Sequence, residues 1–105
     1  MILEHALLSV IPGKEADFER DFRTASAIIS SMRGYVRHTL SRCLEQPSRY
    51  LLLVEWETLE DHTHGFRESA DYGRWKALLH HYYDPFPTVE HYTEVPLPAK
   101  EADRP

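Results

Sequence analysis

The chain has 105 residues, a net charge of −5 and 42% hydrophobic residues. This length suits one domain, and the acidic balance with scattered basic residues argues against a nucleic-acid-binding surface. No run of about 18 apolar residues could cross a membrane, and the N-terminus lacks the basic start and cleavage site of a signal peptide. The one cysteine, Cys43, has no partner for an internal disulfide, which fits a reducing compartment. We therefore expect a cytoplasmic protein.

The first half of the chain predicts a strand, a helix and two more strands. Residues 2–11 are apolar at nearly every position, and Pro12-Gly13 ends this strand. Apolar residues then recur every three or four positions, which is typical of an amphipathic helix; they are Phe18, Phe22, Ala25, Ile29 and Met32. Gly34 stands where a left-handed residue often ends a helix. Strands are expected from Tyr35 to about Leu44 and from Tyr50 to Trp56, with a turn between them.

The second half predicts a two-part helical segment and a last strand. Thr58 and Asp61 have the spacing of a capping box, and Asp71 is a candidate cap for a second helical piece. That piece is expected to bury Tyr72, Trp75, Leu78 and Leu79. The prolines at 85 and 87 end the helix, and residues 88–95 predict the fourth strand.

The order βαββαβ predicts an α+β, ferredoxin-like fold, with a four-stranded antiparallel sheet and both helices on one face. We assign residues 1–95 to the domain and residues 96–105, which are rich in proline and charge, to an extended or flexible tail. The first and third strands lie in the middle of such a sheet and are apolar on both faces. Since the helices cover one face, a second copy of the chain is the simplest cover for the other, and we predict a homodimer.

Residues 56–92 hold five of the seven histidines and most of the aromatic side chains. His62 falls on the same helical face as Leu59 and Phe66 and should point toward the sheet, whereas His64 falls on the polar face. A partly buried imidazole can act as a base or hold a substrate oxygen. It can equally be a structural histidine bonded to a backbone carbonyl. The sequence leaves both interpretations open, and it does not settle which sheet face His91 occupies.

The aromatic residues also have two interpretations. Trp56, Phe66, Tyr72 and Trp75 could wall a pocket for a flat aromatic ligand, held by offset stacking, or they could simply be core. A metal site is not expected, because the HExxH pattern and any Cys/His cluster are absent. On a helix, moreover, His62 and His64 would point in nearly opposite directions.

Several features together carry a family resemblance: the βαββαβ order, Trp56 closing the third strand, the segment GFRESADYGRW on the following helix, and VEHY on the last strand. On these features residues 1–95 resemble the antibiotic biosynthesis monooxygenase family. The resemblance implies a dimeric α+β barrel with a pocket between helices and sheet in each subunit. Members of that family include cofactor-free oxygenases of anthrones and quinols, and haem-degrading enzymes.

The chain departs from both of those groups. Oxygenases with an Asn-Trp pair place the asparagine on the first strand; this sequence has no asparagine, and Ala6 stands at or near that position. Haem-degrading members carry a histidine ligand on the second helix, where this chain has Arg74, Trp75 and Lys76. We therefore expect no haem bound in that mode and no cofactor.

The resemblance implies a cofactor-independent monooxygenase that oxidises a small hydroxylated aromatic, such as a quinol or anthrone, with O₂. His62 would then be the base or oxygen-binding group and Tyr72 a hydrogen-bond donor, with Trp56, Phe66 and Trp75 as substrate-binding walls. The alternative is a non-catalytic dimer of the same fold that binds a small ligand or stabilises an assembly, and the missing asparagine favours it. A ligand-sized cavity under the second helix would support the enzyme.

Overall fold

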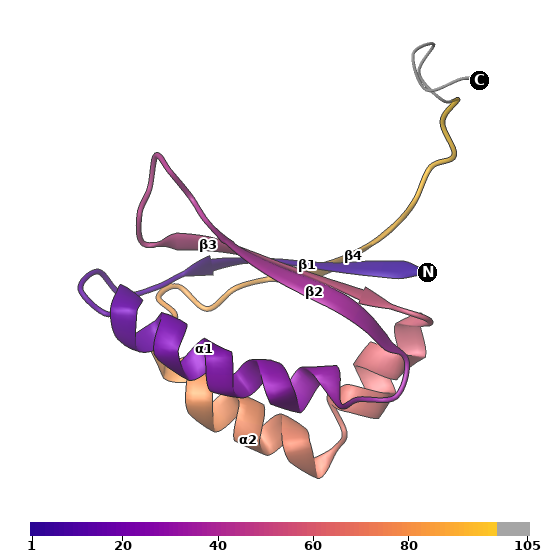
Figure 1. Ribbon diagram of the computed structural model, residues 1–105, viewed down its shortest axis with the longest axis horizontal. Helices are drawn as coiled ribbons and strands as arrows, with labels where there is room; N and C mark the ends of the chain where they lie inside the picture. Colours follow the sequence, from indigo (N-terminus) through magenta and orange to yellow (C-terminus); the bar gives the residue numbers. More distant parts are fainter. Residues whose placement is uncertain (99–105) are drawn as a thin grey trace.

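The computed structural model describes residues 1–98, which form one sheet and two main helices (Figure 1). The elements are β1 (Ile2–Ser9), α1 (Glu15–Ser30), β2 (Tyr35–Arg42), β3 (Arg49–Trp56), the π-helical turn η1 (Asp61–Phe66), α2 (Ala70–Leu79), the 3₁₀ turn η2 (His80–Tyr82) and β4 (Val89–Thr93). All strand pairs are antiparallel in the order β2-β3-β1-β4. This confirms the ferredoxin-like α+β fold. Most of the expected tail, 96–105, lies outside the described residues, so the domain boundary stays a prediction.

Both helices lie against one face of the sheet, and the opposite face carries no helix (Figure 1). In β3, burial alternates strictly, so that Tyr50, Leu52, Val54 and Trp56 share the helix-side face. The core between the layers also contains alternate residues of β1, one stripe of α1 and buried residues of η1, α2 and η2, namely Ala6, Leu8, Phe18, Phe22, Ala25, Ile28, Ile29, Phe66, Trp75, Leu79 and Tyr82. No helix among residues 1–98 has the length and apolar character to cross a membrane.

Gly34 adopts a left-handed conformation, with φ of 81°, but it does not end α1. The helix stops at Ser30, and a turn separates it from Gly34. The glycine is needed because a Cβ there would overlap the carboxylate of Asp61. That carboxylate accepts a hydrogen bond from Thr58 N at 3.2 Å, while Thr58 Oγ1 accepts one from Asp61 N at 3.1 Å. The predicted capping box is therefore confirmed, and it packs against the start of β2.

Gly34→Ala is expected to destabilise the fold more than Gly13→Ala. Both glycines have positive φ, but nothing lies within 4 Å of a Cβ at Gly13. The left-handed conformation costs an L-residue about 1–2 kcal/mol at either site, and overpacking against Asp61 adds about 1–3 kcal/mol at Gly34 alone. Urea unfolding of the two variants measures the difference. Equal losses of stability would show that Asp61 moves aside freely.

The cap of α2 differs from the prediction. Ser69, in an extended conformation, is the N-cap, and its Oγ accepts a hydrogen bond from Tyr72 N at 3.2 Å. Asp71 instead lies in the first turn, where its Oδ1 accepts a hydrogen bond from Arg74 Nη1 at 2.8 Å. Ser69 is the N-cap because its backbone is still extended, as an N-cap position requires.

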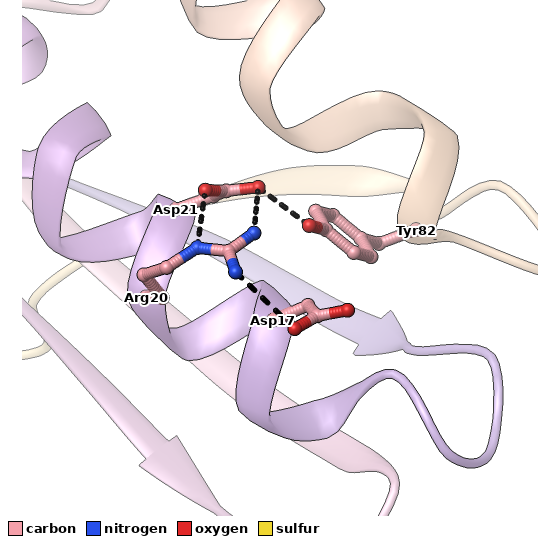
Figure 2. A network of polar contacts seen from close by, with 4 residues as sticks. All are labelled: Asp17, Arg20, Asp21 and Tyr82. Atoms are coloured by element: carbon pink, nitrogen blue, oxygen red, sulfur yellow. Dashed lines mark hydrogen bonds and ion pairs between the residues drawn. The ribbon is translucent and has the colours of Figure 1, made fainter.

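Carboxylates on α1 fasten this helix to its neighbours. The hydroxyl of Tyr82, from η2, donates a hydrogen bond to the Asp21 carboxylate (Figure 2). Arg20 Nε donates to Asp21 Oδ1 at 3.1 Å, and Arg20 Nη1 donates to Asp17 Oδ1 at 3.3 Å. The hydrogen bonds from Arg20 and Tyr82 lower the pKa of Asp21. On the side facing β3, Glu19 accepts a hydrogen bond from the Tyr50 hydroxyl at 2.5 Å. The polar contacts thus fix α1 at both η2 and the sheet.

A β-bulge interrupts the pairing of β2 with β3. Tyr35 pairs with Trp56 and Arg37 pairs with Glu55, which leaves Val36 as an extra residue. As a result Tyr35 and His38 lie on the same, helix-side face, although they are three positions apart. Their side chains are hydrogen-bonded to each other, and His38 Nε2 lies 3.0 Å from Ser26 Oγ of α1.

Candidate functional site

A cavity of about 320 Å³ lies between α2 and the helix-side face of the sheet. This volume falls within the usual range of small-molecule sites, so the expected ligand-sized cavity is present. Its lining comes from β1, β3, η1, α2, η2 and the segment that leads into β4, namely Glu4, Ala6, Leu8, Leu52, His62, Phe66, Arg67, Tyr72, Trp75, His80, Tyr83, Phe86, Pro87 and Val89.

A second hollow, of about 410 Å³, lies between α1 and the β2–β3 hairpin. It is larger but more open, and its charged residues already neutralise one another. Glu19 lies 3.8 Å from Arg23 and 3.6 Å from Arg42. The cavity under α2 is the better candidate site, because its acidic group is buried.

A chain of polar side chains in contact with one another forms one side of that cavity. Glu4 of β1 is only 5% exposed, and its Oε1 accepts a hydrogen bond from Trp56 Nε1 at 3.0 Å. The same oxygen lies 3.3 Å from Nε2 of His62, which is 3% exposed. His62 Nδ1 in turn lies 2.7 Å from Nε2 of His91. Four elements therefore contribute one connected polar group, from Trp56 through Glu4 and His62 to His91.

Strand register and helix periodicity bring these residues together. Glu4 shares the helix-side face with Ala6 and Leu8 because strand side chains alternate, and it pairs directly with His91 on β4. His62 follows the capping box and lies one turn before Phe66, so both point into the fold. Trp56 stacks on His62 with ring centroids 5.4 Å apart and planes at 17°.

Burial sets the protonation of the group. It raises the pKa of Glu4, although the hydrogen bond from Trp56 and the positive charge of Arg67 oppose that effect. It lowers the pKa of His62 to about 3, and the charges of Arg67 and His91 act in the same direction. His91 is shifted downward as well, again mainly by burial. At neutral pH both imidazoles are therefore neutral, so the contact between Glu4 and His62 is not an ion pair.

His62 gives a testable dependence of stability on pH. Its folded pKa of about 3 lies below the ordinary 6.5, so its contribution is complete above pH 6.5 and is lost as the pH falls toward 3. Glu4 has the opposite effect on the free energy of unfolding. Because its pKa is raised in the folded state, lowering the pH protonates Glu4 and favours the folded form. We expect acidification within this window to destabilise the wild type more than His62→Gln in chemical unfolding. His64→Gln, which changes an exposed histidine of the same turn, should lose as much unfolding free energy on acidification as the wild type. Equal losses in the wild type and both variants would contradict the lowered pKa of His62.

The structure brings most of the predicted site residues together. His62, Phe66, Tyr72 and Trp75 all line the cavity. Trp56 is fully buried behind Glu4 and His62 and is not part of the lining. Away from the cavity, the exposed His64 lies 2.7 Å from Glu68, on the polar face as predicted.

The lining residues that the sequence analysis did not assign to the site include Glu4, Arg67 and Tyr83. Glu4 is the acidic residue of an otherwise largely apolar strand. It lies two and four positions before Ala6 and Leu8, so all three share one face of the strand, and this spacing was a signal that could have placed Glu4 on the helix-side face. Arg67 and Tyr83 gave no such signal, because turns after η1 and η2 position them. Burial raises the pKa of Tyr83, and nearby Tyr72 and Glu4 raise it further. Among residues 1–98, no three His, Cys, Asp or Glu side chains are grouped so as to hold a metal ion.

Comparison with known proteins places the chain in a family. The sequence model of the antibiotic biosynthesis monooxygenase family matches residues 1–78. The chain belongs to this family. It is 59% identical to YczJ of Bacillus subtilis (strain 168), an uncharacterized protein, over 90% of this chain and all of the relative.

Solved structures of the family share the fold. One named for the family, from Bordetella bronchiseptica, is 39% identical and has a TM-score of 0.85, over 90% of this chain and 96% of that one. A variant of SnoaB, a cofactor-independent oxygenase from Streptomyces nogalater, is 23% identical with a TM-score of 0.69, over 93% and 97% of the two chains. At that identity the likeness to SnoaB extends to the fold alone.

Proposed function

We propose that this protein is a cofactor-independent monooxygenase that oxidises a small hydroxylated aromatic, of the quinol or anthrone type, with O₂. The observation that carries the proposal is the buried Glu4 carboxylate in the wall of a ligand-sized, aromatic-lined cavity. A carboxylate with a raised pKa is suited to take a proton from a weakly acidic substrate. Membership of the family supports the same class of chemistry.

In the proposed reaction Glu4 takes a proton from the substrate, and the resulting electron-rich anion reacts with O₂. A carbon–oxygen bond forms, and the O–O bond of the peroxide then breaks. When a CH₂ group becomes a carbonyl, the substrate supplies all four electrons; one oxygen atom enters the product and the other leaves as water. The positive charge of Arg67 and the hydroxyl of Tyr72, both in the lining, are placed to stabilise the anion.

Glu4 replaces His62 as the proposed base. Both ring nitrogens of His62 are already engaged, Nε2 with Glu4 and Nδ1 with His91. Glu4 Oε2, in contrast, makes no hydrogen bond to any residue within 1–98 and is left for a substrate. We therefore assign His62 and Trp56 to hold Glu4 Oε1 in place.

Aromatic rings would hold the substrate. Phe66 packs edge-to-face on Tyr72 at 5.1 Å and on Trp75 at 5.5 Å. Such walls favour flat rings through offset or edge-to-face contacts. We therefore assign Phe66 and Trp75 as walls of the substrate site and Tyr72 as a hydrogen-bond donor to the substrate.

A panel of quinols and anthrones incubated with the protein under ¹⁸O₂ tests this function. We expect a product that contains one labelled oxygen atom, formed at an unchanged rate after metal chelation. Quenching of tryptophan fluorescence by the same compounds without any turnover would instead support the ligand-binding alternative. Neither binding nor turnover across the panel would contradict the proposed substrate class.

We also propose that the bare sheet face is covered by a second copy of the chain. Leu7 is 47% exposed on the central strand β1, and Tyr92 is equally exposed on β4. Beside them, Nδ1 of His5 is buried and has no hydrogen-bond partner among residues 1–98. An apolar face of this kind is typical of an interface.

Leu7→Glu is expected to shift the protein from dimer to monomer. A carboxylate in the middle of the covered face would be buried without a partner, which is strongly unfavourable. Sedimentation across a dilution series measures the change. Leu44→Glu, at a 92% exposed position, is the matched control and should remain dimeric. A wild-type protein that stays monomeric at micromolar concentration would contradict the interface.

A further inference from the structure

Glu4 cannot exchange its proton with solvent easily on its own. The residue is 5% exposed, and a substrate bound in the cavity would cover its remaining accessible surface. Within residues 1–98, the titratable side chain in direct polar contact with Glu4 is His62, which is itself 3% exposed. Each turnover of the proposed function nevertheless requires the proton taken by Glu4 to be moved on.

The contacts of His62 continue to the edge of the sheet. Its second ring nitrogen lies 2.7 Å from His91 Nε2. His91 is partly exposed and belongs to β4, which stands at the end of the strand order, beside β1. A path of polar contacts therefore runs from the buried carboxylate through two imidazoles to an edge strand, with 3.3 Å between Glu4 and His62 and 2.7 Å between His62 and His91.

We infer that His62 and His91 form a two-imidazole proton wire that exchanges the proton of Glu4 with solvent. This inference rests on the proposed function for its purpose, but its geometry does not depend on the substrate. In the proposed wire His62 and His91 act through Glu4 as positioning and proton-transfer residues.

The path has two complete arrangements of protons. With Glu4 ionised, His62 Nε2–H donates to Glu4 Oε1, and His91 Nε2–H donates to His62 Nδ1. With Glu4 protonated at Oε1, the carboxyl donates to His62 Nε2, and His62 Nδ1–H donates to His91 Nε2. Since a neutral imidazole carries one donor and one acceptor, each arrangement satisfies every contact.

One proton separates the two arrangements. A proton that reaches His91 Nδ1 from solvent lets the Nε2 proton of His91 pass to His62 Nδ1, and the Nε2 proton of His62 pass to Glu4. The reverse sequence releases the proton of Glu4 through His91. No charge remains on either imidazole at the end of either sequence, so both rings must change tautomer together whenever Glu4 changes charge.

The surrounding groups favour neutral imidazoles. Arg67, which follows η1, acts on both rings and lowers their pKa values. Tyr72 of α2 and Tyr83, which follows η2, are the other titratable groups near Glu4, and burial raises the pKa of each hydroxyl. Glu4 is therefore the group on this path whose pKa is raised toward neutrality.

The direct test is the tautomer of each ring in the full chain. In protein labelled with ¹⁵N-histidine, long-range ¹H–¹⁵N spectra are followed through the titration of Glu4. We expect His62 and His91 to be protonated at Nε2 when Glu4 is ionised, and at Nδ1 when it is neutral, with a single shared midpoint. In Glu4→Gln the shared transition should disappear, while His64→Gln should keep it. A ring that keeps its tautomer, or two different midpoints, would overturn the wire.

Activity provides an independent readout. With a quinol that the wild type oxidises, His91→Ala is expected to lower kcat by about 10²-fold, the lower end for a proton-transfer group, without raising KM. Added imidazole should restore part of the rate. Unchanged kcat in His91→Ala would overturn the wire. If no quinol is oxidised while the tautomers still switch together, the proposed function fails and the wire stands.

Discussion

Glu4→Gln is expected to lower kcat for quinol oxidation about 10²–10⁴-fold, the contribution usual for a general base. Glutamine has nearly the same shape and still offers an acceptor to Trp56 Nε1. It cannot take a proton from the substrate, so KM should change little while kcat falls. This pattern would separate a chemical role from a role in substrate binding.

The matched control for Glu4 is Glu90→Gln. Glu90 is exposed on β4 and pairs with His5, so its side chain lies on the other face of the sheet. Its replacement should leave kcat unchanged. Steady-state measurements of kcat for both variants with the same quinol provide this comparison. A Glu4→Gln enzyme that keeps wild-type kcat would remove the carboxylate from the chemistry.

The same substitution has a predictable effect on stability. Burial raises the pKa of Glu4, so ionising it in the folded state costs free energy, and that cost appears as the pH rises through the folded pKa. Glutamine carries no charge, so Glu4→Gln should not destabilise the protein at neutral pH. A loss of activity in this variant would then reflect the chemistry rather than unfolding.

Trp56→Ala is expected to reduce the free energy of unfolding by about 3–5 kcal/mol, as is usual when a large buried ring is removed. Trp56 is completely buried and packs against Tyr35, His62 and Phe66. Domains of this size are typically stable by only about 5–15 kcal/mol. The variant should therefore be close to unfolding at physiological temperature.

Trp56→Phe separates packing from the hydrogen bond to Glu4. The phenyl ring keeps most of the apolar contact but removes the indole donor to Glu4 Oε1, at a cost of about 1.5–3 kcal/mol for a lost hydrogen bond to a charged group. Because that hydrogen bond lowers the pKa of Glu4, its loss should raise this pKa further. Chemical unfolding and the pH profile of kcat measure the two effects. Trp75→Phe, in a ring that packs on Phe22 and Phe66, is the control and should not shift the profile.

The fold was largely predictable because it depends on local periodicity. The apolar run of β3 predicted a central strand, and the three-to-four spacing of α1 placed Phe18 and Phe22 on its apolar face. The spacing of His62 and Phe66 was sufficient to point both inward. These properties are determined within one element, so the sequence reveals them.

The polar group at the site was less predictable because it depends on pairing between distant strands. Glu4 meets His91 only through the register of β1 with β4, and the sequence left the face of His91 open. The capping box predicted a helical turn after Thr58 but not the wider π-helical winding of η1, which sets the depth of His62. Glu4 was therefore missed although its strand was correctly identified.

The extra residue at Val36 makes the length of β2 critical. Because side chains alternate along a strand, losing that one residue would move Tyr35 to the bare face of the sheet. His38 would then lose its tyrosine partner, and the edge of the Trp56 ring would lose its cover. Length changes in this chain are thus far better tolerated in the hairpin at residues 43–48 than at the start of β2, where a single deletion would expose the ring that supports Glu4.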